Sequence, residues 1–180
     1  MSSMALVGNR TVAKDVSDAV EACEVVVRMG TGRSLDSGKT GKRTDILAVR
    51  VNNDPKLVLT EGKSTQTSRD CRAVWLLKHP LCLEAAAAVL PAMECSDKPA
   101  VTMEPAIDWP EGSVPDLGYY TLEYVLQNAE YDCWQIYICG FPDGPPTDET
   151  PGGFKKHHNL AETRKRIDAY IQQGRITELA

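Results

Sequence analysis

The sequence has 180 residues and a formal net charge of −5, with 42% hydrophobic and 25% charged residues. This length and composition predict one globular domain over residues 1–180, and the acidic balance excludes binding of nucleic acid through overall positive charge. The first residues lack the apolar core of a signal peptide, and no apolar run is long enough to span a bilayer. We therefore expect a cytoplasmic protein that does not associate with membranes.

The first half of the chain predicts a helix followed by a β-hairpin. Valines and a cysteine recur at helical spacing over residues 13–29, and Gly30 follows as a stop signal. Two β-rich runs, 44–51 and 56–65, then flank the sequence NNDP, which has strong turn chemistry. This arrangement predicts that the two runs pair antiparallel.

The second half mixes helices, strands and proline-rich segments. In chain order we expect a helix over 68–93 interrupted at Pro80, an irregular segment over 94–118 with a strand at AVTM, a helix over 119–129, a strand over 133–141, a loop over 142–159 and a helix over 160–173. The predicted fold is therefore α/β, with a small mixed β-sheet flanked by helices.

The stretch GTGRSLDSGKTGKR, residues 30–43, resembles a phosphate-binding P-loop without having its spacing. A Walker A motif places its first glycine five positions before the Gly-Lys pair, and the residue there is Arg33. The chain after the loop is also predicted to be a strand, so no helix N-terminus is available for phosphate. The loop remains basic through Arg33, Lys39, Lys42 and Arg43, and is interpreted either as a solvated segment or as a contact to a phosphate backbone.

The predicted hairpin gathers polar residues at one end of an apolar face. In the inferred register Asp45 lies opposite Lys63, and Glu61 lies on the same face. These residues are interpreted either as a cross-strand ion pair on an exposed edge or as oxygen ligands of a divalent cation beside a catalytic lysine.

Asp45 followed by a strand, a turn and the Glu61-Gly62-Lys63 tripeptide resembles the signature of PD-(D/E)XK nucleases, with Thr44 in the place of the usual proline. This resemblance implies a restriction-endonuclease-like core with α-β-β-α-β order. It also implies a Mg²⁺ or Mn²⁺ site formed by Asp45, Glu61 and a helix acid. The helix acid is Glu24, or alternatively Glu21.

Residues 16–65 also resemble the nuclease subunit of Hachiman-type antiphage defence systems, which implies a helicase or other protein partner. The resulting hypothesis is a metal-dependent endonuclease that cleaves nucleic acid, with DNA as the expected substrate. In it Asp45, Glu61 and Glu24 hold the metal, Lys63 assists the attacking water, and the basic loop binds the phosphate backbone. The alternative is a non-catalytic α/β interaction module that has a structural Asp-Lys pair and docks to a larger partner. The adjacent His157 and His158 are not expected to bind metal, because their side chains diverge.

Overall fold

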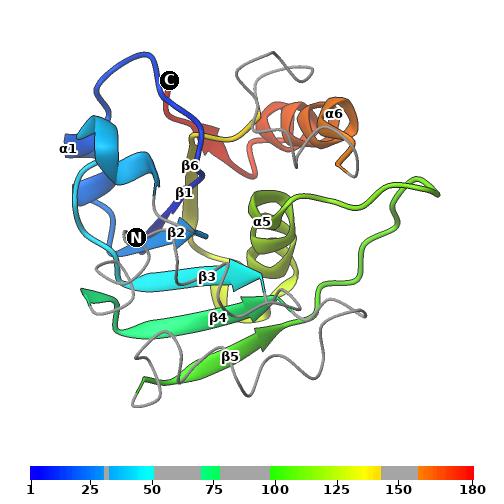
Figure 1. Cartoon of the computed structure of the whole chain (residues 1–180), viewed down its shortest axis with the longest axis horizontal. Helices are drawn as coiled ribbons and strands as arrows, with labels where there is room; N and C mark the ends of the chain where they lie inside the picture. Colours follow the sequence, from blue (N-terminus) through cyan, green and yellow to red (C-terminus); the bar gives the residue numbers. More distant parts are fainter. Residues whose placement is uncertain (31–32, 51–69, 78–97, 143–157) are drawn as a thin grey trace.

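The computed structural model describes residues 1–30, 33–50, 70–77, 98–142 and 158–180 (Figure 1). In chain order its elements are β1 (Ser3–Val7), α1 (Ser17–Glu21), β2 (Val25–Met29), the 3-10 helix η1 (Arg33–Ser37), β3 (Ile46–Arg50), β4 (Ala73–Leu77), β5 (Ala100–Met103), α5 (Leu117–Gln127), the 3-10 helix η2 (Ala129–Tyr131), β6 (Gln135–Cys139), α6 (Leu160–Gln172) and β7 (Thr177–Glu178). No helix in these ranges is long and apolar enough to cross a membrane.

The strands form one 7-stranded sheet in the order β5-β4-β3-β2-β1-β6-β7, and each neighbouring pair is parallel. The predicted mixed sheet and restriction-endonuclease-like core are therefore wrong. From β1 the chain adds β2 to β5 on one side, and it then returns to add β6 and β7 on the other side. The strand order thus reverses between β1 and β6, as in doubly wound α/β folds.

The hairpin prediction fails at β3, whose neighbours on both sides are parallel strands. Residues Ile46 to Ala48 pair with β2, and Ile46 to Arg50 pair with β4. No edge of β3 is therefore left for an antiparallel partner. The proposed partner run, 56–65, lies outside the described residues.

Helices cover both faces of the sheet because buried strands send alternate side chains to opposite sides. Ala5 and Val7 of β1 join the cluster that contains Val20 of α1. Met4 and Leu6 join the cluster on the other face, which α5 and α6 cover (Figure 1). Helices on opposite faces are what right-handed crossovers produce when the direction of strand addition reverses.

The sequence located the elements of the C-terminal half better than those of the N-terminal half. The strand at AVTM, the strand around 135–139 and the two last helices are confirmed within a few residues. The helix expected over 13–29 is wrong in its second half, because the β-branched run at Val25 forms β2 and α1 is short. β1 was missed. Residues 73–77, expected in a helix, form β4, and the rest of 78–97 lies outside the described residues.

Residues 104–116 contain no helix or strand apart from an isolated bridge at Val114, as the proline-rich composition predicted. Most of the predicted loop over 142–159 falls outside the part of the chain that the structure describes.

Candidate functional site

The carboxyl ends of the parallel strands place several polar residues at one edge of the sheet. In open α/β sheets ligands bind outside these ends, at the point where the strand order reverses. Here that point lies between β1 and β6, so the segments that follow these two strands form the centre of the candidate site.

The segments after β1 and β6 approach each other so closely that only glycine fits. The Gly8 amide donates to the Cys139 carbonyl at 2.8 Å, and the Arg10 amide donates to the Gly140 carbonyl at 3.0 Å. A Cβ atom on Gly8 would lie 2.2 Å from the Gly140 oxygen, and Gly140 itself has a φ of 67°. The glycines therefore hold the two loops together at the reversal point.

Asn9, Gly30 and Leu117 bring three elements to this edge. A Cβ atom on Gly30, just after β2, would lie 3.0 Å from Asn9 Nδ2 and 3.9 Å from Leu117 Cδ2. Asn9 follows β1 and is exposed, whereas Leu117 begins α5. The side-chain amide of Asn9 is therefore placed to donate or accept a hydrogen bond at the reversal point.

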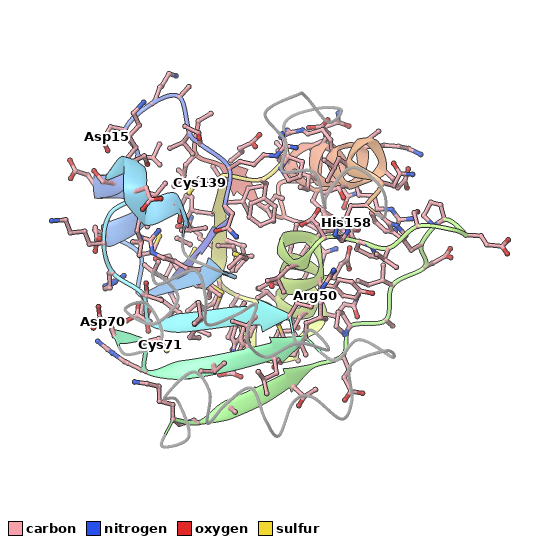
Figure 2. The ribbon with its side chains drawn as sticks, in the orientation of Figure 1. Asp15, Arg50, Asp70, Cys71, Cys139 and His158 are labelled. Carbon is pink, nitrogen blue, oxygen red and sulfur yellow. The ribbon has the colours of Figure 1, made fainter. Side chains whose placement is uncertain are left out.

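Residues 114–116, which precede α5, form the next part of the site. The Arg50 Nη2 atom, at the end of β3, donates to the Pro115 carbonyl at 3.1 Å. His158 Nδ1 lies 3.0 Å from the Val114 carbonyl oxygen. Figure 2 shows Arg50 and His158 near the start of α5, at the same edge of the sheet. The candidate site thus combines a cation, an imidazole and an exposed amide.

His158 is poised as a neutral imidazole. Burial lowers its pKa most, and Arg50 lowers it further, while hydrogen bonding to the Val114 and Pro115 carbonyls and the charge of Asp116 oppose the shift. A carbonyl can only accept a hydrogen bond, so Nδ1 carries the proton in this contact and Nε2 carries the lone pair. His158 therefore has the protonation state of a general base at neutral pH.

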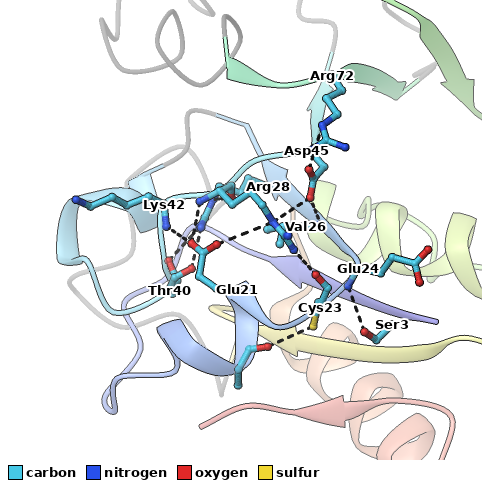
Figure 3. A network of polar contacts seen from close by, with 12 residues as sticks. Ser3, Glu21, Cys23, Glu24, Val26, Arg28, Thr40, Lys42, Asp45 and Arg72 are labelled. Carbon is cyan, nitrogen blue, oxygen red and sulfur yellow. Dashed lines mark hydrogen bonds and ion pairs between the residues drawn. The ribbon is translucent and has the colours of Figure 1, made fainter. Parts of the chain in front are cut away.

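The predicted acids that the structure describes lie at the opposite edge, where the strands begin: Glu21 and Glu24 precede β2, and Asp45 precedes β3. Asp45 is buried; its Oδ2 accepts from the Val26 amide at 2.9 Å. The same carboxylate pairs with Arg43 Nε at 3.2 Å and with Arg72 Nε at 3.6 Å (Figure 3). Asp45 thus ties β2, β3 and β4 together at their amino ends.

The two helix acids are not gathered around Asp45. Glu24 is exposed, and its side chain is directed away from Asp45 in Figure 3. Glu21 accepts hydrogen bonds from the amides of Lys42 and Arg43 through Oε1. Glu61 and Lys63 lie outside the described residues. Among the residues that the structure describes, no group of three or more His, Cys, Asp or Glu side chains could hold a metal ion.

The basic loop is held in place by buried polar contacts. The buried guanidinium of Arg28 donates to the Thr40 carbonyl at 2.7 Å and to the Arg43 carbonyl at 2.9 Å. Lys39 Nζ donates to the Ala13 carbonyl at 2.8 Å, whereas Lys42 is exposed. Arg33 lies in η1. The contact of this loop with the phosphate backbone of a nucleic acid stays a prediction.

Comparison with known proteins does not support the nuclease resemblance. No protein-family model matches the chain. A stretch of 76 residues is 34% identical to the urease operon 23 kDa accessory protein of Rhizobium meliloti (strain 1021). The aligned stretch covers 41% of this chain and 34% of that protein. This chain therefore aligns with about a third of that protein's length. Together with the all-parallel sheet, this similarity makes the resemblance to PD-(D/E)XK and Hachiman-type nucleases wrong.

Sequence reasoning missed Asn9, Arg50, Asp116 and His158. Each follows or ends a strand, or precedes a helix, so its role depends on strand order rather than on a local motif. The usable signal was Gly8-Asn9 directly after the apolar run MALV, which is typical of a turn at the end of a buried strand.

We expect Asp45→Ala to lower the free energy of unfolding by about 2 kcal/mol, because the buried Val26 amide loses a charged acceptor. Chemical denaturation measures this change. The exposed Glu24→Ala is the control and should alter stability by no more than about 0.5 kcal/mol. An Asp45→Ala protein with unchanged stability would contradict the structural role and favour the predicted metal site.

Proposed function

We propose that this protein is a nucleotide-dependent transferase, which binds a mononucleotide-activated donor at the carboxyl edge of the sheet and transfers its activated group to an acceptor hydroxyl. The observation that carries the proposal is the reversal of strand order between β1 and β6, which brings Asn9, Gly30, Arg50 and His158 to one edge. Doubly wound sheets bind nucleotides at this position.

The loop after β1 favours a mononucleotide over a dinucleotide. Dinucleotide sites use the fingerprint G-x-G-x-x-G and an acid at the end of the second strand, which binds the ribose. Here Gly8 is followed by Asn9 and Arg10, so the second glycine of the fingerprint is missing. The end of β2, where the acid would stand, is formed by Met29 and followed by Gly30. The spacing of residues 30–43 also lacks the P-loop pattern.

The residues of the site fit the steps of such a transfer. Arg50 offers positive charge for a phosphate of the donor, and Asn9 offers a hydrogen bond at the reversal point. His158 Nε2 accepts the proton of the acceptor hydroxyl while the oxygen of that hydroxyl forms a bond to the transferred group. The bond between this group and the nucleotide phosphate breaks, and the nucleotide leaves with the bonding electrons.

A binding screen tests the proposal. We expect a nucleotide or nucleotide sugar to bind, measured by calorimetry and by the rise in melting temperature. NAD and inorganic phosphate are the comparison ligands. Asn9→Ala should weaken binding about tenfold through the loss of one hydrogen bond. Asn128→Ala is the matched control, because Asn128 lies between α5 and β6 at the other edge. Failure of every nucleotide to bind, or equal binding by Asn9→Ala, would overturn the proposal.

The nuclease activity expected from the sequence, with its Mg²⁺ or Mn²⁺, nucleic acid and helicase partner, stays an untested prediction. Incubation with plasmid and single-stranded DNA in the presence of either metal, compared with Glu61→Ala, checks it directly. The name of the Rhizobium protein connects that protein with a urease operon. The aligned stretch is too short to bring an accessory role to this chain.

A further inference from the structure

Residues 114–116 are held by three different elements. Besides the contacts from Arg50 and His158, the Asp116 side chain caps α5, with Oδ1 accepting from the Tyr119 amide at 3.1 Å. This short segment therefore joins the end of β3, the start of α5 and the residue just before the N-cap of α6.

The second oxygen of Asp116 links this segment to α6. Asp116 Oδ2 accepts from Thr163 Oγ1 at 3.2 Å, and the two residues are 5% and 0% exposed. Breaking a hydrogen bond to a buried carboxylate is costly, because water does not replace the lost donor. Gly118 makes room for this carboxylate, because a Cβ atom there would lie 3.0 Å from Asp116 Oδ1 and 3.1 Å from Phe141 Cε1.

We propose that Asp116 is a positioning residue for His158 and acts through Thr163. A backbone bridge joins Val114 to His158, and the link fixes the first turn of α6 relative to residues 114–116, so that the Val114 carbonyl stays against His158 Nδ1. This contact selects the tautomer in which Nε2 holds the lone pair. The effect on transfer rests on the proposed function, whereas the effect on the imidazole does not.

Thr163 allows a test that keeps Asp116 itself. Thr163→Val removes the hydroxyl with little change of shape, and Thr163→Ser restores a hydroxyl. Thr121→Val is the matched control: Thr121 is also buried, but its hydroxyl donates to the Leu117 carbonyl of its own helix at 2.8 Å. The readout is the nitrogen NMR spectrum of the His158 ring, assigned by the loss of its signals in His158→Gln.

In the wild type and in Thr163→Ser and Thr121→Val, we expect a protonated Nδ1 with a slowly exchanging proton. In Thr163→Val this proton should exchange rapidly, and the two tautomers should mix. An unchanged His158 spectrum in Thr163→Val would overturn the proposal, as would the same change in Thr121→Val.

Asp116→Asn gives a second readout, because it keeps a hydrogen-bonding group and removes the charge. Among the described residues, the charges of Arg50 and Asp116 act on the pKa of His158 in opposite directions. The pKa of His158 should therefore fall in Asp116→Asn, and an unchanged or raised pKa would contradict the charge contribution.

In a transfer assay Thr163→Val should lower kcat about tenfold or more with little change in KM. The NMR measurements need no nucleotide, so they distinguish failure of this inference from failure of the proposed function.

Discussion

Replacement of His158 by glutamine is expected to lower the rate of group transfer by a factor of about 10² to 10⁴, the usual contribution of a general base. Glutamine can still donate a hydrogen bond to the Val114 carbonyl, but it has no basic nitrogen. Nucleotide affinity should therefore change little. Steady-state kinetics with the nucleotide donor identified by the binding screen separate the effect on kcat from the effect on KM.

The pH dependence of the reaction follows from the direction of the His158 shift. The base must be neutral, and burial lowers the pKa of His158 below the ordinary histidine value of about 6.5. Activity should therefore persist as the pH falls through that value and be lost only at lower pH. His157→Gln is the control from the neighbouring position. If His157→Gln removed activity and His158→Gln did not, the assignment of the base would be wrong.

The same shift affects stability with a definite sign. A histidine whose pKa is lowered by folding binds its proton more tightly in the unfolded chain. His158 therefore supports folding fully at pH values above the unfolded pKa, and this contribution declines as the pH falls below it. The loss of activity at low pH and the loss of stability at low pH must be measured separately. Initial rates measure the first and chemical denaturation at each pH measures the second.

Local signals were sufficient for α5, β6 and α6 because each carries its own pattern. The amphipathic spacing after Leu160 and the aromatic and β-branched run at 135–139 specify a helix and a strand without reference to the rest of the chain. The order of the strands is a different kind of property. It depends on contacts between residues far apart in the sequence, such as the pairing of Met4 with Ile136.

Asp45 shows how far the interpretation of a local pattern depends on the assumed strand register. A carboxylate at the start of an apolar strand was interpreted as a metal ligand, on a register that assumed a hairpin. In the parallel sheet the same residue accepts the Val26 amide and pairs with Arg43 and Arg72. The alternative interpretation was an ion pair with Lys63, which is not described. The ion-pair partners of Asp45 among the described residues are arginines.

The site at the other edge could not be assembled from sequence for a related reason. Asn9, Arg50 and His158 are separated by long stretches of chain and share no motif. They lie at one edge of the sheet because parallel strands place all their carboxyl ends on one side and because β6 returns beside β1. Only knowledge of the strand order turns these residues into a candidate site.

Substitution of Gly8 by alanine is expected to cost about 3 kcal/mol or more of folding free energy, at the upper end of overpacking effects. The added Cβ atom would lie 2.2 Å from the Gly140 carbonyl oxygen, which belongs to the backbone and cannot rotate away. β1 and β6 would have to separate at the point where the strand order reverses. Nucleotide affinity should fall together with stability, as measured by chemical denaturation and calorimetry.

Gly140 and Gly38 separate crowding from backbone strain. Both have a φ of 67°, so alanine carries the same conformational cost at either position. A Cβ atom on Gly140 would meet the Gly8 and Arg10 oxygens at 2.9 Å, whereas one on Gly38 would meet nothing within 4 Å. Gly140→Ala should therefore destabilise the protein clearly more than Gly38→Ala and should also weaken nucleotide binding. An equal loss of folding free energy in the two variants would mean that the segments after β1 and β6 move apart at little cost. Close contact between these segments would then not shape the site.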